Sequence, residues 1–221
     1  MTELLDHYDL AGKRALVVHD TPASDAIAHA YGEAQAQVTR VADESGVADA
    51  IAEIGGVDIL ASGPDVFLAK PIGDTDDTEL LAVMAGNFTA HYSAVREASA
   101  SMGTGGRIVL VTSVLGERGL PNCSAYAAAQ GATHNLIRAL AQELAPRGIS
   151  INGIALGWMD WMDDRLDPTD EEASRAVRFS IAKRKGEGAD IGPMAVWLSG
   201  TGAGFVTGQI FAADGGLLQH L

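Results

Sequence analysis

Short runs of consecutive apolar residues alternate with longer, alanine-rich stretches along the chain. The apolar runs predict six strands, at 14–18, 37–41, 57–61, 107–112, 150–155 and 209–213. Because these runs lack polar alternation, both faces of the strands are expected to be buried. The stretches between them predict helices over about 22–34, 46–54, 78–102, 124–145 and 191–198. Alternation of this kind predicts an α/β fold, a doubly wound parallel sheet with right-handed crossovers.

One segment departs from the alternation. Asp160–Glu172 (DWMDDRLDPTDEE) is acidic and has tryptophan and methionine residues in it and just before it. Thr169 followed by Glu172 has the spacing of a capping box, which predicts the start of a helix. We interpret the segment as an inserted lid or contact surface. The alternative is a solvated acidic helix whose aromatic residues pack into the core.

Composition narrows the class of protein. A chain of 221 residues fits a single domain spanning 1–221, and no linker or repeat divides it. The formal net charge of -14 makes nucleic acid and anionic membranes poor partners. No apolar run reaches the roughly 18 residues of a membrane span, and the first ten residues do not resemble a signal peptide. A single cysteine, Cys123, excludes an internal disulfide, so we expect a cytoplasmic protein.

The histidines and the cysteine give no sign of a metal site. None of the six histidines has the spacing of metal ligands, so no bound metal is expected. His7, His91 and His220 are expected at the surface or in loops. Cys123 has no base near it in the sequence and is expected to be a small packing residue.

Three polar residues stand in a recognisable order. Ser113 follows the predicted strand RIVLVT, and Tyr126 comes thirteen residues later in SAYAAAQGA. Asn87 precedes them in GNFTA, while ELAPRGISINGIALG and TGQIFAADGG follow them. In order and spacing the chain resembles the short-chain dehydrogenase/reductase family from start to end. The resemblance implies a Rossmann-like sheet.

The resemblance also implies a catalytic set, and this chain has only part of it. In that family a tyrosine moves a proton to or from the substrate oxygen, a serine holds that oxygen, and an asparagine supports a water chain. Ser113, Tyr126 and Asn87 occupy these positions. A lysine four residues after the tyrosine would hold the nicotinamide ribose and lower the tyrosine pKa, but Gln130 stands there. Since glutamine has no charge, we interpret the three residues as inactive remnants of a catalytic site.

The nucleotide-binding turn departs further. The family places three glycines after its first strand, so that the backbone can approach the pyrophosphate. Here that turn reads VVHDTPASDAIA, with His19, Ala23 and Asp25 at about the glycine positions. Their side chains fill the space of the phosphates, and the aspartate adds negative charge. We therefore expect this chain to bind no cofactor.

Two more departures affect the same pocket. The family's Asn-Asn-Ala-Gly is replaced by Ser62-Gly63-Pro64-Asp65. Only 17 positions run from Val41 to Val57, whereas a strand–helix–strand crossover takes roughly 30. The sheet is thus expected to be shortened by about one strand and one helix between the second strand and Val57. Arg40 and Asp43 stand where a ribose could be read, although two solvated charges are the simpler interpretation.

These losses favour one functional hypothesis. We expect a non-catalytic subunit, a pseudoenzyme, that associates with an active NAD-dependent short-chain alcohol or hydroxyacyl-CoA dehydrogenase in a hetero-oligomer, most simply a heterotetramer. The partner subunit would bind the NAD. The chain looks like the inactive partner subunit of the hydroxyacyl-CoA dehydrogenase of benzylsuccinate degradation. Small residues suited to close helix contact lie on the tyrosine helix: Ala127, Ala128, Ala129 and Ala132.

Two alternatives stay open. The first is a divergent, active NAD(P)-dependent oxidoreductase that uses Ser113 and Tyr126. The second is a cofactor-free enzyme that resembles the halohydrin dehalogenases, which also lack the glycine turn. Those enzymes carry an arginine where this chain has Gln130, which counts against the second alternative.

Overall fold

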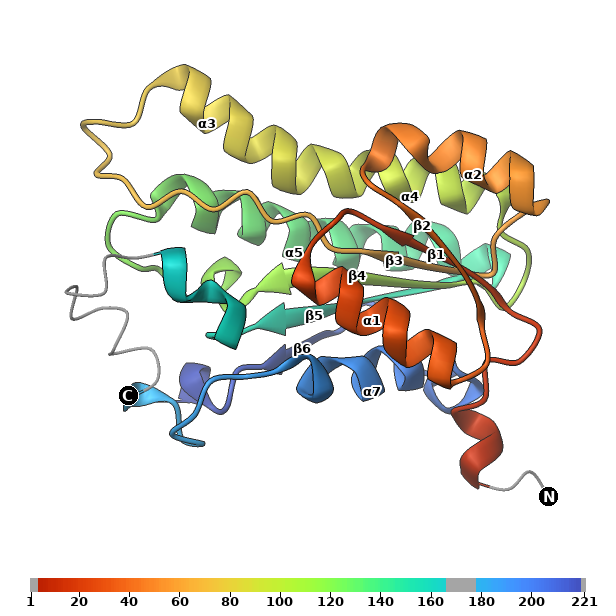
Figure 1. Ribbon diagram of the computed structural model, residues 1–221. Coiled ribbons are helices and arrows are strands. Elements are labelled where there is room, and N and C mark those ends of the chain that lie inside the picture. The colour runs from red at the N-terminus through yellow and green to blue at the C-terminus, as the bar shows by residue number, and fades with distance from the viewer. Residues whose placement is uncertain (1–3, 166–177, 220–221) are drawn as a thin grey trace.

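The computed structural model describes residues 4–165 and 178–219. Its centre is a six-stranded parallel sheet with the strand order β2-β1-β3-β4-β5-β6 (Figure 1). The strands are β1 (Arg14–Val18), β2 (Gln37–Val41), β3 (Ile59–Ser62), β4 (Arg107–Ser113), β5 (Ser150–Leu156) and β6 (Ile210–Ala213). The α/β fold class and the doubly wound sheet predicted from the apolar runs are confirmed.

The shortening of the sheet is also confirmed. Between β2 and β3 the chain forms only a 3-10 turn, Glu44–Gly46, and the helix α2, Val47–Ile54. The sheet therefore ends at β2, which is an edge strand. Strand β3 starts two residues after the predicted Val57, because Asp58 turns its carboxylate back to the backbone N–H and guanidinium of Arg14.

Helices cover both faces of the sheet. On one face lie α1 (Pro22–Glu33) and α7 (Gly188–Ser199), and on the other α2, α4 (Ala90–Ser101) and α5 (Ser124–Leu144) (Figure 1). Helices α1 and α7 pack closely because Gly192 faces Ala30: a Cβ added at Gly192 would lie 2.8 Å from the Ala30 Cβ. Of the alanines expected at an association surface, Ala129 is instead fully buried, whereas Ala128 is exposed.

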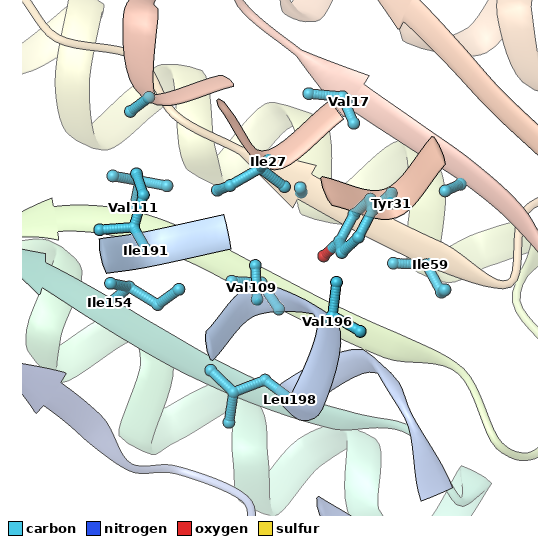
Figure 2. Close-up of a cluster of buried hydrophobic side chains, with 14 of the residues drawn as sticks. Val17, Ile27, Tyr31, Ile59, Val109, Val111, Ile154, Ile191, Val196 and Leu198 are labelled. Carbon is cyan, nitrogen blue, oxygen red and sulfur yellow. The ribbon is translucent and has the colours of Figure 1, made fainter. Parts of the chain in front are cut away.

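Between the sheet and the α1/α7 layer lies an apolar cluster. Figure 2 shows side chains from the sheet, such as Val109 and Ile154, meeting Ile27 and Ile191 from the two helices. Each fully buried aliphatic side chain of this kind contributes about 1.5–3 kcal/mol to folding. Tyr31 extends through the layer, and its hydroxyl lies 2.7 Å from Ser199 Oγ, so that its one polar atom is satisfied.

The long helix predicted over 78–102 contains an insertion. Helix α3 (Asp77–Met84) begins at a capping box made by Asp76 and Glu79, and α4 continues the same rod. Between them, Ala85–Thr89 form a π turn. Such turns add one residue to the helical register and often mark functional sites. Here the insertion contains Asn87.

The acidic segment is only partly described. Asp160–Arg165 form a 3-10 turn in which Met162 is buried. Thr169 and Glu172, the expected capping box, lie outside the described residues. Within residues 4–165 and 178–219, no helix is long and apolar enough to cross a membrane. The same ranges contain no cluster of three or more histidine, cysteine, aspartate or glutamate side chains arranged to hold a metal ion.

Candidate functional site

The structure brings the three expected remnants together at the carboxyl ends of the central strands. Ser113 is the last residue of β4, Tyr126 and Gln130 lie on consecutive turns of α5, and Asn87 lies on the π turn. The Ser113 hydroxyl accepts a hydrogen bond of 3.2 Å from the Leu115 N–H, which caps the short turn after the strand. Strand ends and helix starts thus converge on one polar cluster.

Gln130, at the position of the family's lysine, points into the protein. Its side chain is buried, and Oε1 accepts from the Thr112 hydroxyl at 2.6 Å and from the Ser113 N–H at 3.1 Å. Its Nε2 donates to Asn87 Oδ1 at 3.2 Å. The glutamine therefore links β4 to the π turn, and it presents no charge to Tyr126.

The Asn87 side chain is also fully hydrogen-bonded within the protein. Its Nδ2 donates to the carbonyl oxygens of Val66 and Val83, at 2.9 and 2.8 Å, and its Oδ1 also accepts from the Val66 N–H. Every polar atom of this buried amide has a protein partner. Asn87 fixes the loop that follows β3, and both hydrogens of its side-chain amide are used within the protein.

The Tyr126 hydroxyl is held by a carboxylate. It donates to Asp65 Oδ1 at 2.9 Å, and Asp65 also forms an ion pair with Arg165, whose guanidinium lies over the Phe67 ring. Tyr126 is 3% exposed. Burial, and then the negative charge of Asp65, raise the pKa of the phenol above its ordinary value, and Arg165 offsets this only in part. The phenol therefore keeps its proton throughout the physiological pH range.

The turn after β1 uses its own backbone donors. The N–H groups of His19 and Asp20 bond to the carbonyls of Val41 and Ala42, at 3.0 and 3.2 Å. The Ser24 N–H is capped by Thr21 Oγ1 at 3.2 Å. In a pyrophosphate-binding turn these groups would point at the anion. Here these N–H groups bond instead to carbonyl oxygens at the end of β2 and to the Thr21 side chain.

Side chains fill the turn as well. His19 keeps the left-handed backbone that a glycine would adopt, with φ 81°, but its ring is buried. Asp25 forms an ion pair with Arg40, and Asp20 lies 3.5 Å from the same guanidinium. Asp43 caps the Glu44–Gly46 turn through the Ser45 N–H. Arg40 and Asp43 are thus engaged within the protein and not presented to a ribose.

Little space joins this turn to the tyrosine. The cavity lined by Ala23, Gly63, Ser113 and Tyr126 has a volume of about 10 Å³, at the lower limit for one water molecule. A dinucleotide that reached Tyr126 from the turn would have to cross this space. The used donors, the acidic side chains and this small cavity all oppose a nicotinamide dinucleotide bound along the turn.

Sequence reasoning missed several residues of the site. Asp65 is visible as a departure from the family motif, but its contacts with Tyr126 and Arg165 are not. His91, expected at the surface, is 1% exposed, so that expectation is wrong. Its position one residue after Ala90, and three and four before Ala94 and Val95, places it on the buried face of α4. Cys123 is buried and free, as expected of a packing residue.

His91 belongs to a buried chain of hydrogen bonds. Its Nε2 donates to the Val111 carbonyl at 3.0 Å, and its Nδ1 accepts from Ser62 Oγ at 2.9 Å. His19 Nδ1 lies 3.4 Å from the same hydroxyl, and His19 Nε2 lies 3.3 Å from Glu44. Burial, followed by the nearby His19, lowers the pKa of His91 to about 3. The imidazole rings of this hydrogen-bonded chain fill the space beside the turn.

Comparisons with known proteins agree with this architecture. A family model described as enoyl-(acyl carrier protein) reductase matches residues 15–218. The cyclic-di-GMP-binding biofilm dispersal mediator protein of Escherichia coli is 34% identical over 82% of this chain and 76% of its own length. A putative short-chain alcohol dehydrogenase from Sinorhizobium meliloti superposes with a TM-score of 0.90 at 26% identity, covering 97% of this chain and all of that one.

A structure with a bound cofactor is similarly close. A putative NAD(P)-dependent gluconate 5-dehydrogenase from Beutenbergia cavernae, with bound NADP, superposes with a TM-score of 0.89 at 29% identity. The match covers 96% of this chain and 99% of that one. Both of these structural neighbours are named as dehydrogenases. The chain belongs to the short-chain dehydrogenase/reductase family.

Proposed function

We propose that this protein is a non-catalytic subunit that associates with an active NAD-dependent short-chain alcohol or hydroxyacyl-CoA dehydrogenase and supports it. One observation carries the proposal: the Tyr126 hydroxyl donates to Asp65, on the loop that replaces the family's adenosine-lining motif. The replacement of the family motif by Ser62-Gly63-Pro64-Asp65 therefore alters the nucleotide side of the site and also supplies the hydrogen-bond acceptor of the phenol. NAD would be bound by the partner subunit.

The chemistry of proton transfer supports this interpretation. A general acid or base works best when its pKa lies near the working pH. A lysine beside the tyrosine would stabilise the phenolate, whereas Asp65 stabilises the neutral phenol and raises the pKa. Arg165 is the nearby cation, but its charge is paired with Asp65. The site is thus arranged against the step that the family's tyrosine performs.

The outer face of α5 is the surface we assign to the partner. It is exposed at Ala128, Asn135, Arg138 and Ala139, which follow one another at helical spacing. Two of these side chains, those of Ala128 and Ala139, are small and allow a partner helix to approach closely. The buried face of the same helix forms the core around Ile137 and Leu144.

The first experiment is a calorimetric titration of the purified chain with NAD, NADH, NADP and NADPH, each to millimolar concentration. We expect no binding of any of them. Cyclic-di-GMP, the ligand named for the Escherichia coli relative, is included, and Asp20 and Asp25 beside the turn predict that it does not bind either. Tight nicotinamide binding together with dehydrogenase turnover by this chain alone would contradict the proposal.

The second experiment tests association. A tagged chain is expressed in its native host, the co-purifying short-chain dehydrogenase is identified, and the pair is reconstituted and weighed by light scattering. We expect a heterotetramer whose dehydrogenase activity falls when Ala128→Arg is introduced into this chain. The matched control is Ala52→Arg on the exposed face of α2, which leaves the complex intact. A stable homo-oligomer that ignores every such partner would refute the assignment.

The divergent oxidoreductase remains a second candidate, because Ser113 and Tyr126 both line a pocket of about 310 Å³. It requires a nicotinamide that approaches without using the turn. Turnover with a nicotinamide that is lost in Tyr126→Phe would establish this candidate in place of the first. Turnover that survives the substitution would come from a contaminating enzyme.

A further inference from the structure

The larger pocket beside Tyr126 is mainly apolar. It has a volume of about 310 Å³ and lies between the turn after β4, the segment after β5 and the C-terminal turn. Its walls include four aromatic side chains, those of Phe67, Tyr126, Trp158 and Phe179. Pockets that bind small molecules have this character, with a few polar groups that orient the ligand.

The pocket is separate from the nucleotide turn. The pocket and the 10 Å³ space next to Ala23 are two cavities that adjoin, divided by the side chains that line both: Ser113, Tyr126, Leu156 and Met162. The ion pair between Asp65 and Arg165 holds this partition in place. A ligand can therefore fill the pocket without a nucleotide, whereas in an oxidoreductase the two ligands must touch.

The polar groups that line the pocket differ in how far their charge or hydrogen bonds are satisfied. Arg165 is paired with Asp65. Arg118 is exposed and donates through Nη1 to the Leu217 carbonyl at 3.1 Å, and within the described parts of the chain it has no acidic partner. The Ser113 oxygen accepts from Leu115, which leaves its hydrogen able to donate. In a chain of net charge -14, the pocket thus combines an apolar body with an unneutralised cation at its mouth.

From this arrangement we infer that the pocket binds a small amphipathic carboxylate, without any nucleotide. At about 30 Å³ for each water-sized group, the volume holds about ten non-hydrogen atoms. An eight-carbon carboxylate has this size. Its chain lies against the aromatic walls, and its carboxylate pairs with Arg118 at the mouth. The inference extends the proposed function, on which it rests in one respect: no nicotinamide takes part.

Calorimetry with octanoate tests the inference, and octanamide, of the same size and without charge, is the comparison ligand. We expect octanoate to bind with a Kd below about 1 mM, a reasonable affinity for ten atoms in an apolar pocket. Octanamide should bind about fivefold more weakly, the value of one partly exposed ion pair. The tryptophan fluorescence should change with the same midpoint, because Trp158 lines the pocket.

Three variants locate the site. Leu115→Trp places a large ring in the pocket wall and should abolish binding, while Arg118→Gln should weaken octanoate about fivefold and leave octanamide unchanged. Arg96→Gln, an exposed arginine on α4 beyond the pocket, is the matched control and should bind as the parent does. Circular dichroism of each variant shows that the fold is retained.

The outcomes separate the two proposals. No binding of octanoate at 10 mM (about ten times the expected Kd) would overturn the inference and leave the non-catalytic role untouched. Equal binding of octanoate and octanamide, or no effect of Arg118→Gln, would overturn the assignment of a carboxylate. Binding of octanoate only when NADH is present would overturn both proposals, because the pocket would then depend on a nicotinamide.

Discussion

Acidification should reveal the burial of His91, and this is the sharpest quantitative consequence of the structure. The ring is 1% exposed and is bonded to the Val111 carbonyl and the Ser62 hydroxyl. If the His91 ring took up a second proton, its positive charge would be buried away from water. Burial, then the neighbouring His19, hold the pKa of His91 at about 3 in the folded chain.

The sign and size of the effect follow from linkage. In the unfolded chain the His91 pKa returns to its ordinary value of 6.5, so at pH 5 the unfolded state binds a proton that the folded state does not. Stability is therefore present above pH 6.5 and is lost as the pH falls from 6.5 toward 3. Each unit of that window costs about 1.4 kcal/mol, which amounts to about 2 kcal/mol between pH 7.5 and pH 5.

The assay is urea unfolding at pH 7.5 and pH 5.0, for the parent and for His91→Gln. Glutamine can donate to the Val111 carbonyl and accept from Ser62, but it does not titrate. We expect the parent to lose about 2 kcal/mol more than the variant between the two pH values. His29→Gln is the control, because His29 is exposed on α1 and should change nothing.

Both the parent and His91→Gln should still lose some stability at acid pH. Burial also lowers the pKa values of His19 and His134, and both act in the same direction. Glu44 beside His19 and Glu117 beside His134 partly oppose those shifts. The double difference isolates His91. If His91→Gln loses as much stability as the parent does, the reasoning about its buried, neutral ring is refuted.

Three further changes have defined outcomes. Gly192→Ala places a methyl group 2.8 Å from the Ala30 Cβ and should cost about 1–3 kcal/mol in urea unfolding, because α1 and α7 must separate. Gly32→Ala, at a helical glycine with no neighbour within 4 Å of the added Cβ, should instead stabilise by about 0.5–1 kcal/mol; destabilisation would contradict its open surroundings. Asp65→Asn removes the charge that raises the Tyr126 pKa, so ultraviolet titration should show a phenol that ionises at lower pH; an unchanged titration would mean that burial alone sets the pKa.

The local pattern of the chain predicted most of the architecture. Uninterrupted apolar runs such as RALVV mark strands buried on both faces, and the short spacing from Val41 to Val57 showed that the sheet lacked a strand and a helix. These features depend on hydrophobic burial and chain length, which can be read residue by residue. The order Ser113, Tyr126 and Gln130 could also be read from the sequence. The spacing of four residues between Tyr126 and Gln130 predicts that they lie one turn apart on a helix, as they do on α5.

The orientation of individual side chains was less predictable. His91 was expected at the surface or in a loop, yet it lies on a helix whose neighbouring residues Ala94, Val95 and Ala98 are all buried. The signal was present in the spacing along α4. The π turn before it had no such signal, because one inserted residue changes the register of a helix without changing its apolar composition.

The state of the site was decided by tertiary structure alone. Asp65 reaches Tyr126 across 61 residues of sequence and Arg165 across 100. The resemblance to the family's motifs implied that the lysine and the glycines were missing, but not which contacts took their place. The partners of a buried polar group depend on which loops the fold brings within hydrogen-bond distance. For that reason the sequence determined the sheet and the remnants on it, whereas only packing between distant segments decided that the tyrosine is bound to a carboxylate.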